Sequence, residues 1–404
     1  MLKLAWRNLW RNKRRTLITI SSVFFAVFLS ILMRGFHVGS WQNLIDNVLH
    51  SYTGYVQVHA KGYWENKNFD YSLSANDSVF KKITRIQNVK ELIPRLESFS
   101  LASAGEKTKG VITVGIDPEK ENHFTKLKSR IVSGRYFNKN DTSIILSQRL
   151  ATFLKLKVND SLVLLSQGYQ GVSATGIFKI AGIVKLPAPE FDNQLVFLPL
   201  PVAQEFYSAP NLLSSIVVDV HDPEKIDKTV RHIRKVLGNE HFETMLWTEM
   251  LVELYQQYIT DEGGALIMLG LLYIIVGFGV FGTVLMMLAE RKREMSIMVT
   301  LGMQRGRLIQ LISVELFIIC LLGVICGFVG SIPIITYFHF HPIEMKGEMV
   351  KAYEAFGMEP IIPVALQAGY MLQQAFNIFA MIVIVLVYPL YTVYKMNLTK
   401  ALKR

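Results

Sequence analysis

The stretch Ala289–Leu308, AERKREMSIMVTLGMQRGRL, separates two long apolar runs of the chain. Charged residues stand near both of its ends, and methionine, isoleucine, valine and leucine fill its middle. A solvated turn between two helices does not need these apolar side chains, so we interpret the stretch as a short helix that docks against another protein. Glu290 and Arg293 are expected to pair on one face of this helix. Gly302 is expected to end it in a left-handed cap, which glycine adopts at little cost.

The apolar runs on both sides of this stretch indicate a membrane protein. Of 404 residues, 51% are hydrophobic, and the mean hydropathy is +0.30. A soluble enzyme needs less apolar material. A helix crosses a hydrocarbon core of about 30 Å with roughly 20 apolar residues. The sequence therefore predicts four spans, at about 16–33, 264–288, 308–338 and 368–394.

Positive charge is concentrated at the ends of these spans. The net charge is +11, and Lys and Arg residues cluster in 1–15, 289–308 and 395–404. With four spans these clusters fall on one side, so the positive-inside rule places both termini in the cytoplasm. No nucleic-acid partner is expected, because binding nucleic acid takes a basic groove on a folded domain.

The first segment, 1–15, has the pattern of an amphipathic helix that lies in the membrane interface. Lys3, Arg7 and Arg11 share one face, whereas Trp6 and Leu9 share the other. An uncleaved first span is favoured over a secretory signal peptide, because no small-residue cleavage site follows the apolar run.

Residues 51–241 change to short β-rich runs separated by Gly, Pro, Asn and Asp, and helical pieces are predicted between them near 79–86, 148–156 and 223–237. We predict a membrane α-helical protein with an α+β extracytoplasmic domain of two subdomains inserted between its first and second helices. A second helical stalk is expected at 242–259, because Leu246, Met250, Leu254 and Tyr258 recur every four residues. The predicted segments, in chain order, are 1–15 (interfacial helix), 16–50 (first span and stalk), 51–241 (extracytoplasmic domain), 242–288 (stalk and second span), 289–308 (cytoplasmic loop), 308–338 (third span), 339–367 (short extracytoplasmic loop), 368–394 (fourth span) and 395–404 (cytoplasmic tail).

Small and acidic residues inside the spans suggest contacts between helices. Gly323 and Gly327 have the GxxxG spacing that lets two backbones approach closely in a membrane. Glu315 lies about two turns into the third span, where a buried carboxylate needs a partner. We expect an ion pair with an arginine of the 289–308 loop or with a partner subunit, and a role in transport is the alternative.

Motifs for catalysis and metal binding are lacking in the sequence. There is no phosphate-binding GxxxxGK[ST] loop, no HExxH and no GxSxG. Cys320 and Cys326 both lie inside an apolar run, and no group of histidines has metal-ligand spacing. The chain is therefore not expected to be an enzyme or to hold a metal or cofactor.

Several motifs occur together in a recognisable order. The loop has Glu290–Glu294 followed by Met295, Ile297 and Leu301–Gly302, and Glu315 opens the third span. The amino terminus reads LAWRNLWRNKRRTLIT, and Tyr388–Pro389 and Ala401–Leu402 stand near the carboxy terminus. These features, with runs such as SGRYF and FDNQLVFLPLPVAQ between the first two spans, resemble the FtsX/MacB/LolC-type permeases of ABC transporters. The resemblance covers essentially the whole chain.

The resemblance implies a fold with a MacB-like periplasmic core domain and a mechanism of mechanotransmission. In such systems the loop is a coupling helix that seats in a separate cytoplasmic ABC ATPase dimer, which holds the ATP and Mg²⁺. A second permease copy, identical or a related paralogue, completes the complex in the bacterial inner membrane. The residues expected to couple to the ATPase are Glu290, Arg291, Arg293, Glu294, Met295, Met298, Leu301 and Gly302.

The lipoprotein-releasing (LolC/LolE) branch is the best match within the family. The cell-division branch has a much smaller outer domain, and the macrolide-exporter branch carries its ATPase on the same chain. One permease of the lipoprotein-releasing branch has a hairpin hook for a periplasmic carrier, whereas the corresponding turn here, 167–176, is short and glycine-rich. We expect a lipoprotein or another amphiphile as cargo, and the short turn argues against a periplasmic carrier that docks through a hook. The alternative is a regulatory subunit that transmits motion to an envelope enzyme or sensor without moving cargo.

Acyl chains of such a cargo are expected to enter between the first and second spans. Large apolar and flexible side chains suit ligands of variable shape. The candidate lining residues are Phe24, Phe25, Phe28, Met33, Met268, Leu272 and Tyr273. Lipid-facing or helix-packing residues have the same composition, so this alternative stays open.

Overall fold

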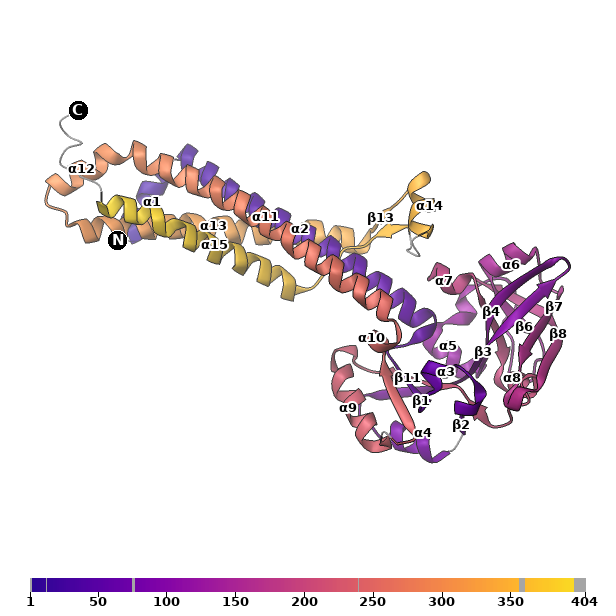
Figure 1. Cartoon of the computed structure of the whole chain (residues 1–404). Coiled ribbons are helices and arrows are strands. Elements are labelled where there is room, and N and C mark those ends of the chain that lie inside the picture. Colours follow the sequence, from indigo (N-terminus) through magenta and orange to yellow (C-terminus); the bar gives the residue numbers. More distant parts are fainter. Residues whose placement is uncertain (1, 12, 75–76, 239, 356–359, 396–404) are drawn as a thin grey trace. The chain divides into compact units, whose positions relative to one another are not determined.

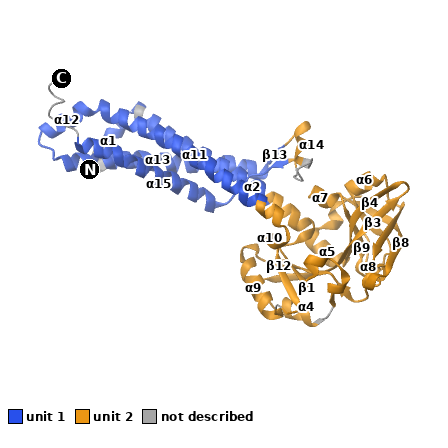
Figure 2. Ribbon diagram, in the orientation of Figure 1, with its two compact units in different colours: residues 1–42, 257–344, 361–404 blue, residues 43–256, 345–360 orange. Residues whose placement is uncertain are grey.

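The computed structural model describes residues 2–11, 13–74, 77–238, 240–355 and 360–395. The chain divides into two compact units (Figures 1 and 2). Unit 1 comprises residues 1–42, 257–344 and 361–404, and unit 2 comprises 43–256 and 345–360. Residues 396–404 of the predicted carboxy-terminal tail, with the pair Ala401–Leu402, lie outside the described residues.

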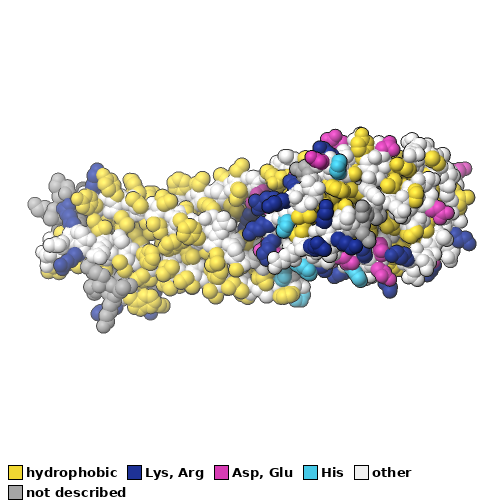
Figure 3. All heavy atoms as spheres, turned by 90° about the horizontal axis from the view of Figure 1, so that it is seen from below, with side chains coloured by type: hydrophobic (Ala, Val, Ile, Leu, Met, Phe, Trp, Pro, Cys, Tyr) yellow, Lys and Arg dark blue, Asp and Glu magenta, His cyan; other side chains and the backbone are white. Residues whose placement is uncertain are grey.

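Unit 1 is a bundle of helices. Its helices, two of which continue into unit 2, are α1 (Leu2–Arg11), α2 (Lys13–Val48), α11 (Val252–Glu290), α12 (Lys292–Thr300), α13 (Arg305–Phe340) and α15 (Ala368–Lys395). In the part of the chain that the structure describes, α2, α11, α13 and α15 are long and apolar enough to cross a membrane. Figure 3 shows hydrophobic side chains over most of the visible face of this unit. The four predicted spans are therefore confirmed as helices.

The spacing of two glycines brings α13 against α2. A Cβ atom on Gly323 would lie 2.6 Å from Cβ of Val23, and one on Gly327 would lie 2.8 Å from the carbonyl oxygen of Phe24. Neither position leaves room for a side chain, so the two backbones approach as the GxxxG spacing predicts.

Polar side chains also join α2 to α11 within unit 1. Arg34 donates two hydrogen bonds to the carboxylate of Glu262, at 2.6 and 2.8 Å. At the preceding residue of α11, Asp261 accepts from Trp41 Nε1 at 2.6 Å and lies 2.9 Å from His37 Nε2. A bidentate Arg–carboxylate pair fixes orientation as well as distance, so the two helices are held in register at this level.

Unit 2 contains a mixed β-sheet with helices packed against it. Its strands are β1 (Val56–Ala60), β2 (Leu73–Ser74), β3 (Val89–Ala104), β4 (Lys107–Ile116), β5 (Ile131–Gly134), β6 (Ile144–Ser147), β7 (Ser161–Gln167), β8 (Ser173–Val184), β9 (Leu195–Pro199), β10 (Leu212–Leu213), β11 (Ser215–Val220) and β12 (Phe242–Leu246). Its helices are α3 (Tyr63–Asn66), α4 (Asp77–Thr84), α5 (Pro118–Thr125), α6 (Gln148–Leu154), α7 (Pro189–Asp192), α8 (Leu200–Phe206), α9 (Ile226–Leu237) and α10 (Trp247–Met250). The helices predicted near 79–86, 148–156 and 223–237 are α4, α6 and α9, with boundaries shifted by two or three residues.

Part of the sheet closes on itself. The pairs β3–β4, β4–β9, β9–β6, β6–β8, β8–β7 and β7–β3 form a continuous ring. Buried residues of these strands, among them Leu96, Ile144 and Leu164, form one apolar core. A second core lies between β1, β11 and the helices α4 and α9, and includes Val58, Ile83 and Ile233. Closure leaves these strands without free edges.

The long strand β3 is a feature that the sequence patterns did not predict. Pro94 interrupts its apolar pattern, and proline normally argues against a central strand. In the structure Pro94 pairs with Ile216 of β11, and pairing with β4 begins one residue later, at Arg95. The proline therefore stands where β3 has a neighbour on one side, and its missing N–H costs no ladder bond.

The predicted helical stalk at 242–259 is wrong in its first part. Phe242–Leu246 is strand β12 and pairs with β1, and the long helix begins only at Val252. A segment of five residues is too short for its pattern to distinguish a helix from a strand. Phe242–Leu246 forms a strand because it pairs with the open edge of β1. The glycine-rich turn is also shorter than predicted, because Gln167 still belongs to β7 and Ser173 starts β8.

Short elements also fill the loop predicted at 339–367. They are β13 (Ile343–Glu344), which pairs with β14 (Ile361–Ile362), and α14 (Glu348–Ala355).

The helices α2 and α11 each connect to one of two neighbouring strands of unit 2. A π-helical turn, Leu49–Thr53, follows α2 and leads into β1, while β12 leads through α10 into α11. The N–H of Trp247 donates to the carbonyl of Tyr55 at 2.9 Å, which ties these two connecting segments to each other. Any displacement of α2 or α11 at this end therefore acts on paired strands.

Candidate coupling site

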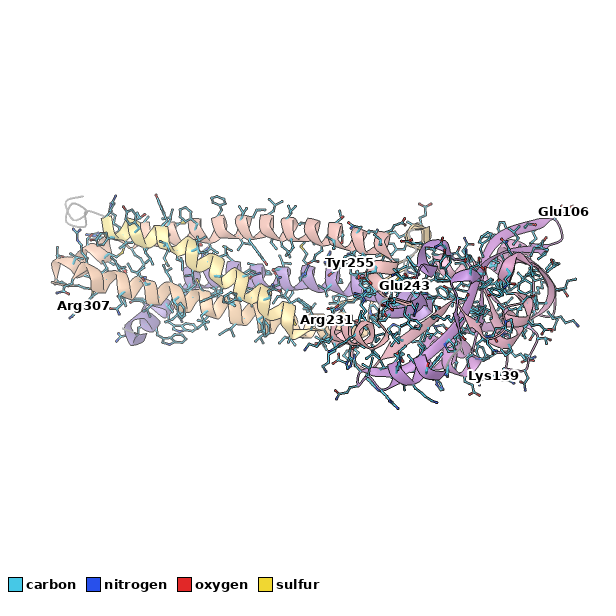
Figure 4. All side chains as sticks on the ribbon, turned by 60° about the horizontal axis from the view of Figure 1, so that its bottom comes forward. Glu106, Lys139, Arg231, Glu243, Tyr255 and Arg307 are labelled. Carbon is cyan, nitrogen blue, oxygen red and sulfur yellow. The ribbon has the colours of Figure 1, made fainter. Side chains whose placement is uncertain are left out.

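The loop between the second and third spans folds as a separate short helix. The helix α11 ends at Glu290 and α12 begins at Lys292, with Arg291 as its N-cap. Glu290 and Arg293 are thus on different helices, so the expectation that they share the face of one helix is wrong. Arg307, labelled in Figure 4, lies in the first turn of α13 at this end of unit 1.

Gly302 ends α12 as expected. Its φ is +98°, and its N–H donates to the carbonyl of Val299 at 3.1 Å. The N–H of Met303 reaches back to the carbonyl of Met298 at 3.0 Å. This pair of bonds is a Schellman cap, which needs a residue that tolerates positive φ.

A chain of charged side chains joins α12 to its neighbours. Arg291 Nη1 donates to Glu315 Oε1 at 2.5 Å, and its Nε lies 3.4 Å from Glu294 Oε2. Glu294 also accepts from Arg11 Nη2 at 2.8 Å. Side chains from α1, α12 and α13 therefore form one network, with Arg291 at its centre.

The inner half of this network is buried. Arg291 is 9% exposed and Glu315 is 3% exposed, whereas Glu294 lies nearer the surface. The sequence offers two partners for Glu315, and the structure pairs it with the arginine of the loop. The partnership of Arg11 with Glu294 is not predicted by the sequence, in which Arg11 belongs to the basic face of an interfacial helix.

The apolar residues of α12 divide into two groups. Met295 is buried, and Met298 and Val299 pack against the helical core. Leu301, at 83% exposed, and Ile297 face outward together with Lys292 and Arg293. Met295 and Met298 therefore anchor α12 to its own chain, and the surface free for a partner is formed by the outward group.

Two of the candidate cargo-lining residues contact different helices of the bundle. The ring of Phe24 lies against Gly330 of α13 and stacks on Phe28, with ring centroids 5.6 Å apart. The hydroxyl of Tyr273 donates to Gln374 of α15, which also accepts from Ser30 at 3.0 Å. Phe24 thus packs on the third span and Tyr273 on the fourth, and entry of acyl chains between the first and second spans stays a prediction.

The other candidate lining residues lie on the outside of the bundle or partly within it. Phe25 and Met268 are exposed, and Phe28, Met33 and Leu272 are half-buried.

An apolar pocket does lie beside Tyr273, between α11 and α15. Its volume is about 400 Å³, and Gly277, Phe278, Met381 and Tyr388 are among its lining residues. This size is within the range of small-molecule pockets, and its walls carry few polar groups.

Two histidines, His59 and His339, make contacts within the protein. No group of three or more His, Cys, Asp or Glu that could hold a metal occurs in the described part of the chain. His339 Nδ1 lies 2.8 Å from the carbonyl oxygen of Val364. Burial lowers the pKa of His59, whose ring stacks on Tyr63 in unit 2.

Comparison with known families accounts for both units. Residues 16–236 match the MacB-like periplasmic core domain, and residues 266–398 match the FtsX-like permease C-terminal domain. The chain belongs to this family of ABC transporter permeases. The predicted fold class, four membrane helices with an α+β domain inserted between the first and second, is confirmed.

Individual relatives are distant. The lipoprotein-releasing system transmembrane protein LolC of Xylella fastidiosa is 20% identical, over 59% of this chain and 59% of its own. The macrolide export ATP-binding/permease protein MacB of Campylobacter jejuni is 22% identical, over 83% of this chain and 53% of its own. An uncharacterised ABC transporter permease of Bacillus subtilis, YknZ, is 20% identical, over 81% of this chain and 83% of its own. The alignments thus span less than two thirds of the LolC and MacB relatives.

Solved structures of outer domains also resemble part of this chain weakly. The periplasmic region of MacB from Actinobacillus actinomycetemcomitans is 13% identical, with a TM-score of 0.36 over 54% of this chain and 98% of its own. The extracellular domain of YknZ is 16% identical, with a TM-score of 0.33 over 47% of this chain and 98% of its own.

Proposed function

We propose that this permease transmits ATP-driven motion from a separate cytoplasmic ABC ATPase dimer to unit 2, and so extracts or exports lipoproteins or other amphiphiles. The observation that carries the proposal is the buried Arg291–Glu315 ion pair. It fixes the short helix α12 to the third span, so that force applied to α12 moves a membrane helix rather than a loose loop.

The orientation that we propose places α12 and both termini in the cytoplasm and unit 2 in the periplasm. The basic residues at this end of the helices support it, because positive charge is retained on the cytoplasmic side. Lys292, Arg293, Ile297 and Leu301 then face the ATPase. ATP and Mg²⁺ would bind to that ATPase, and a second permease copy would complete the complex.

Motion of α12 would reach unit 2 through contacts that lie within each of the two units. In unit 1, the Arg34–Glu262 pair holds α2 and α11 in register. In unit 2, those helices lead into the paired strands β1 and β12. We infer that the two helices act together as the lever. The apolar pocket between α11 and α15 is the surface that we propose for acyl chains of the cargo.

Replacing Glu294 by Gln and Gly302 by Ala should uncouple ATP hydrolysis from motion of unit 2. Glu294 joins Arg11 to Arg291, and a β-carbon at φ +98° costs about 1–2 kcal/mol, so α12 should lose its fixed position. The measurement is ATP-dependent hydrogen exchange of β1 and β12 in the reconstituted complex, with ATP hydrolysis recorded in parallel.

The matched control is Arg307→Gln with Gly306→Ala. Both residues lie in the first turn of α13, Arg307 is exposed, and no heavy atom lies within 4 Å of a Cβ built on Gly306. The control should couple like the unchanged protein. If the Glu294→Gln/Gly302→Ala variant also assembled and coupled normally, the role assigned to α12 would be wrong.

A further inference from the structure

A second pocket, polar at one end, lies where α1, α2 and α11 come together in unit 1. Its volume is about 540 Å³. Arg11 of α1, the first turns of α2 and the last two turns of α11 form its walls. None of the residues proposed for cargo or expected to couple, other than Glu290, lines it.

Positive charge dominates the polar end of this pocket. Lys13 and Arg14 are exposed side chains at the start of α2. Arg11 also lines the pocket but is held by Glu294 at 2.8 Å. Glu290, from α11, is the acid among the lining residues. Lys13 and Arg14 are therefore the two cations that can bind an anion. Glu290 adds one negative charge on the opposite wall, so the net charge of the pocket stays positive.

The position of the pocket along the helices matches a lipid headgroup. The candidate membrane span that contains α2 begins at Thr16, and the span formed by α11 ends at Glu290. Ile18 lies four residues deeper than Arg14, and Met286 lies four residues deeper than Glu290. Both side chains line the pocket and are more than half exposed. Four residues advance a helix by about 6 Å, so the charged end meets the headgroup layer and the apolar end meets acyl chains.

We propose that this pocket binds an anionic phospholipid. Lys13 and Arg14 hold its phosphate, and Ile18 and Met286 contact the upper part of an acyl chain. Basic pockets next to membrane helices attract anionic headgroups through charge, and zwitterionic lipids lack the net charge for this. The bound lipid would fill the space beside α11 immediately before α12, and so would support the end of the helix that carries the coupling loop.

The test compares lipids on the purified full-length chain by native mass spectrometry. Phosphatidylglycerol and phosphatidylcholine with the same acyl chains are added separately, and inorganic phosphate is added as a competitor. The variants are Lys13→Gln/Arg14→Gln and, as matched control, Arg305→Gln/Arg307→Gln. The control removes two exposed cations from the start of α13, outside this pocket.

One phosphatidylglycerol should bind the unchanged chain about tenfold more tightly than phosphatidylcholine, and the Lys13/Arg14 variant should lose this preference. The Arg305/Arg307 variant should keep it. The proposal is overturned if both lipids bind equally, if both variants behave alike, or if inorganic phosphate at millimolar concentration displaces the lipid. Should the double variant not insert, Arg14→Gln and the charge-conserving Arg14→Lys give the same comparison, with preference reduced in the first and kept in the second.

Discussion

The Arg291→Met substitution should lower the free energy of unfolding of unit 1 by about 3 to 5 kcal/mol. Arg291 is the hydrogen-bond partner of Glu315 Oε1, and the other oxygen of this carboxylate has no partner among the described residues. Removing the arginine leaves a buried charge without compensation, which is far more costly than losing an ion pair at the surface. Unfolding in mixed detergent micelles measures the difference.

Two further variants separate the ion pair from general damage. Lys292→Met removes the neighbouring exposed cation, and its effect should stay within about 0.5 kcal/mol. The double variant Arg291→Met/Glu315→Leu replaces both buried partners by apolar side chains, and most of the lost stability should return. Equal losses in Arg291→Met and Lys292→Met would contradict the buried pair as an anchor of α12.

Arg95→Met should destabilise unit 2 by a similar amount, about 3 to 5 kcal/mol. Both Arg95 and Glu121 are fully buried, and they share two hydrogen bonds, at 2.9 and 2.7 Å. Arg95 Nη1 also donates to the carbonyl of Tyr52, in the π-helical turn after α2, at 2.5 Å. The arginine thus attaches the π-helical turn after α2 to β3 and α5. Hydrogen exchange of β3 in the full-length chain measures the loss.

A surface pair of the same geometry provides the control. Arg135 donates two hydrogen bonds to Asp141, at 2.7 and 2.9 Å, but its side chain is exposed. Arg135→Met should therefore change exchange far less than Arg95→Met. The Arg95→Met/Glu121→Met variant should recover part of the protection of β3 but not the bond to Tyr52. If Arg135→Met were as damaging as Arg95→Met, burial would not explain the role of this pair.

Long apolar runs made the spans of this chain predictable, and short alternating or apolar runs made most of its strands predictable. Local chemistry is enough to interpret three of these features. Runs of about 20 apolar residues predict the spans, the GxxxG spacing at Gly323 predicts close helix packing, and Gly302 predicts the end of α12. The ends of elements were less certain, because Phe242–Leu246 becomes a strand only when β1 lies beside it.

Contacts between distant parts of the sequence were the features that could not be predicted. Arg95 and Glu121 belong to different elements, and so do Arg34 and Glu262. Nothing in their local sequence distinguishes them from surface charges. The burial of Met295 likewise depends on the packing of α12 against the spans, which a single amphipathic pattern does not specify.

Photo-crosslinking from position 301 tests most directly whether α12 docks on an ATPase. Leu301→p-benzoylphenylalanine places the probe on the most exposed apolar residue near the end of α12, and Ile177→p-benzoylphenylalanine places it on a similarly exposed site in unit 2, where Ile177 is 71% exposed. In native membranes, we expect an adduct with an ATP-binding subunit from position 301 and not from position 177. An ATPase adduct from position 177 but not from position 301 would contradict the account.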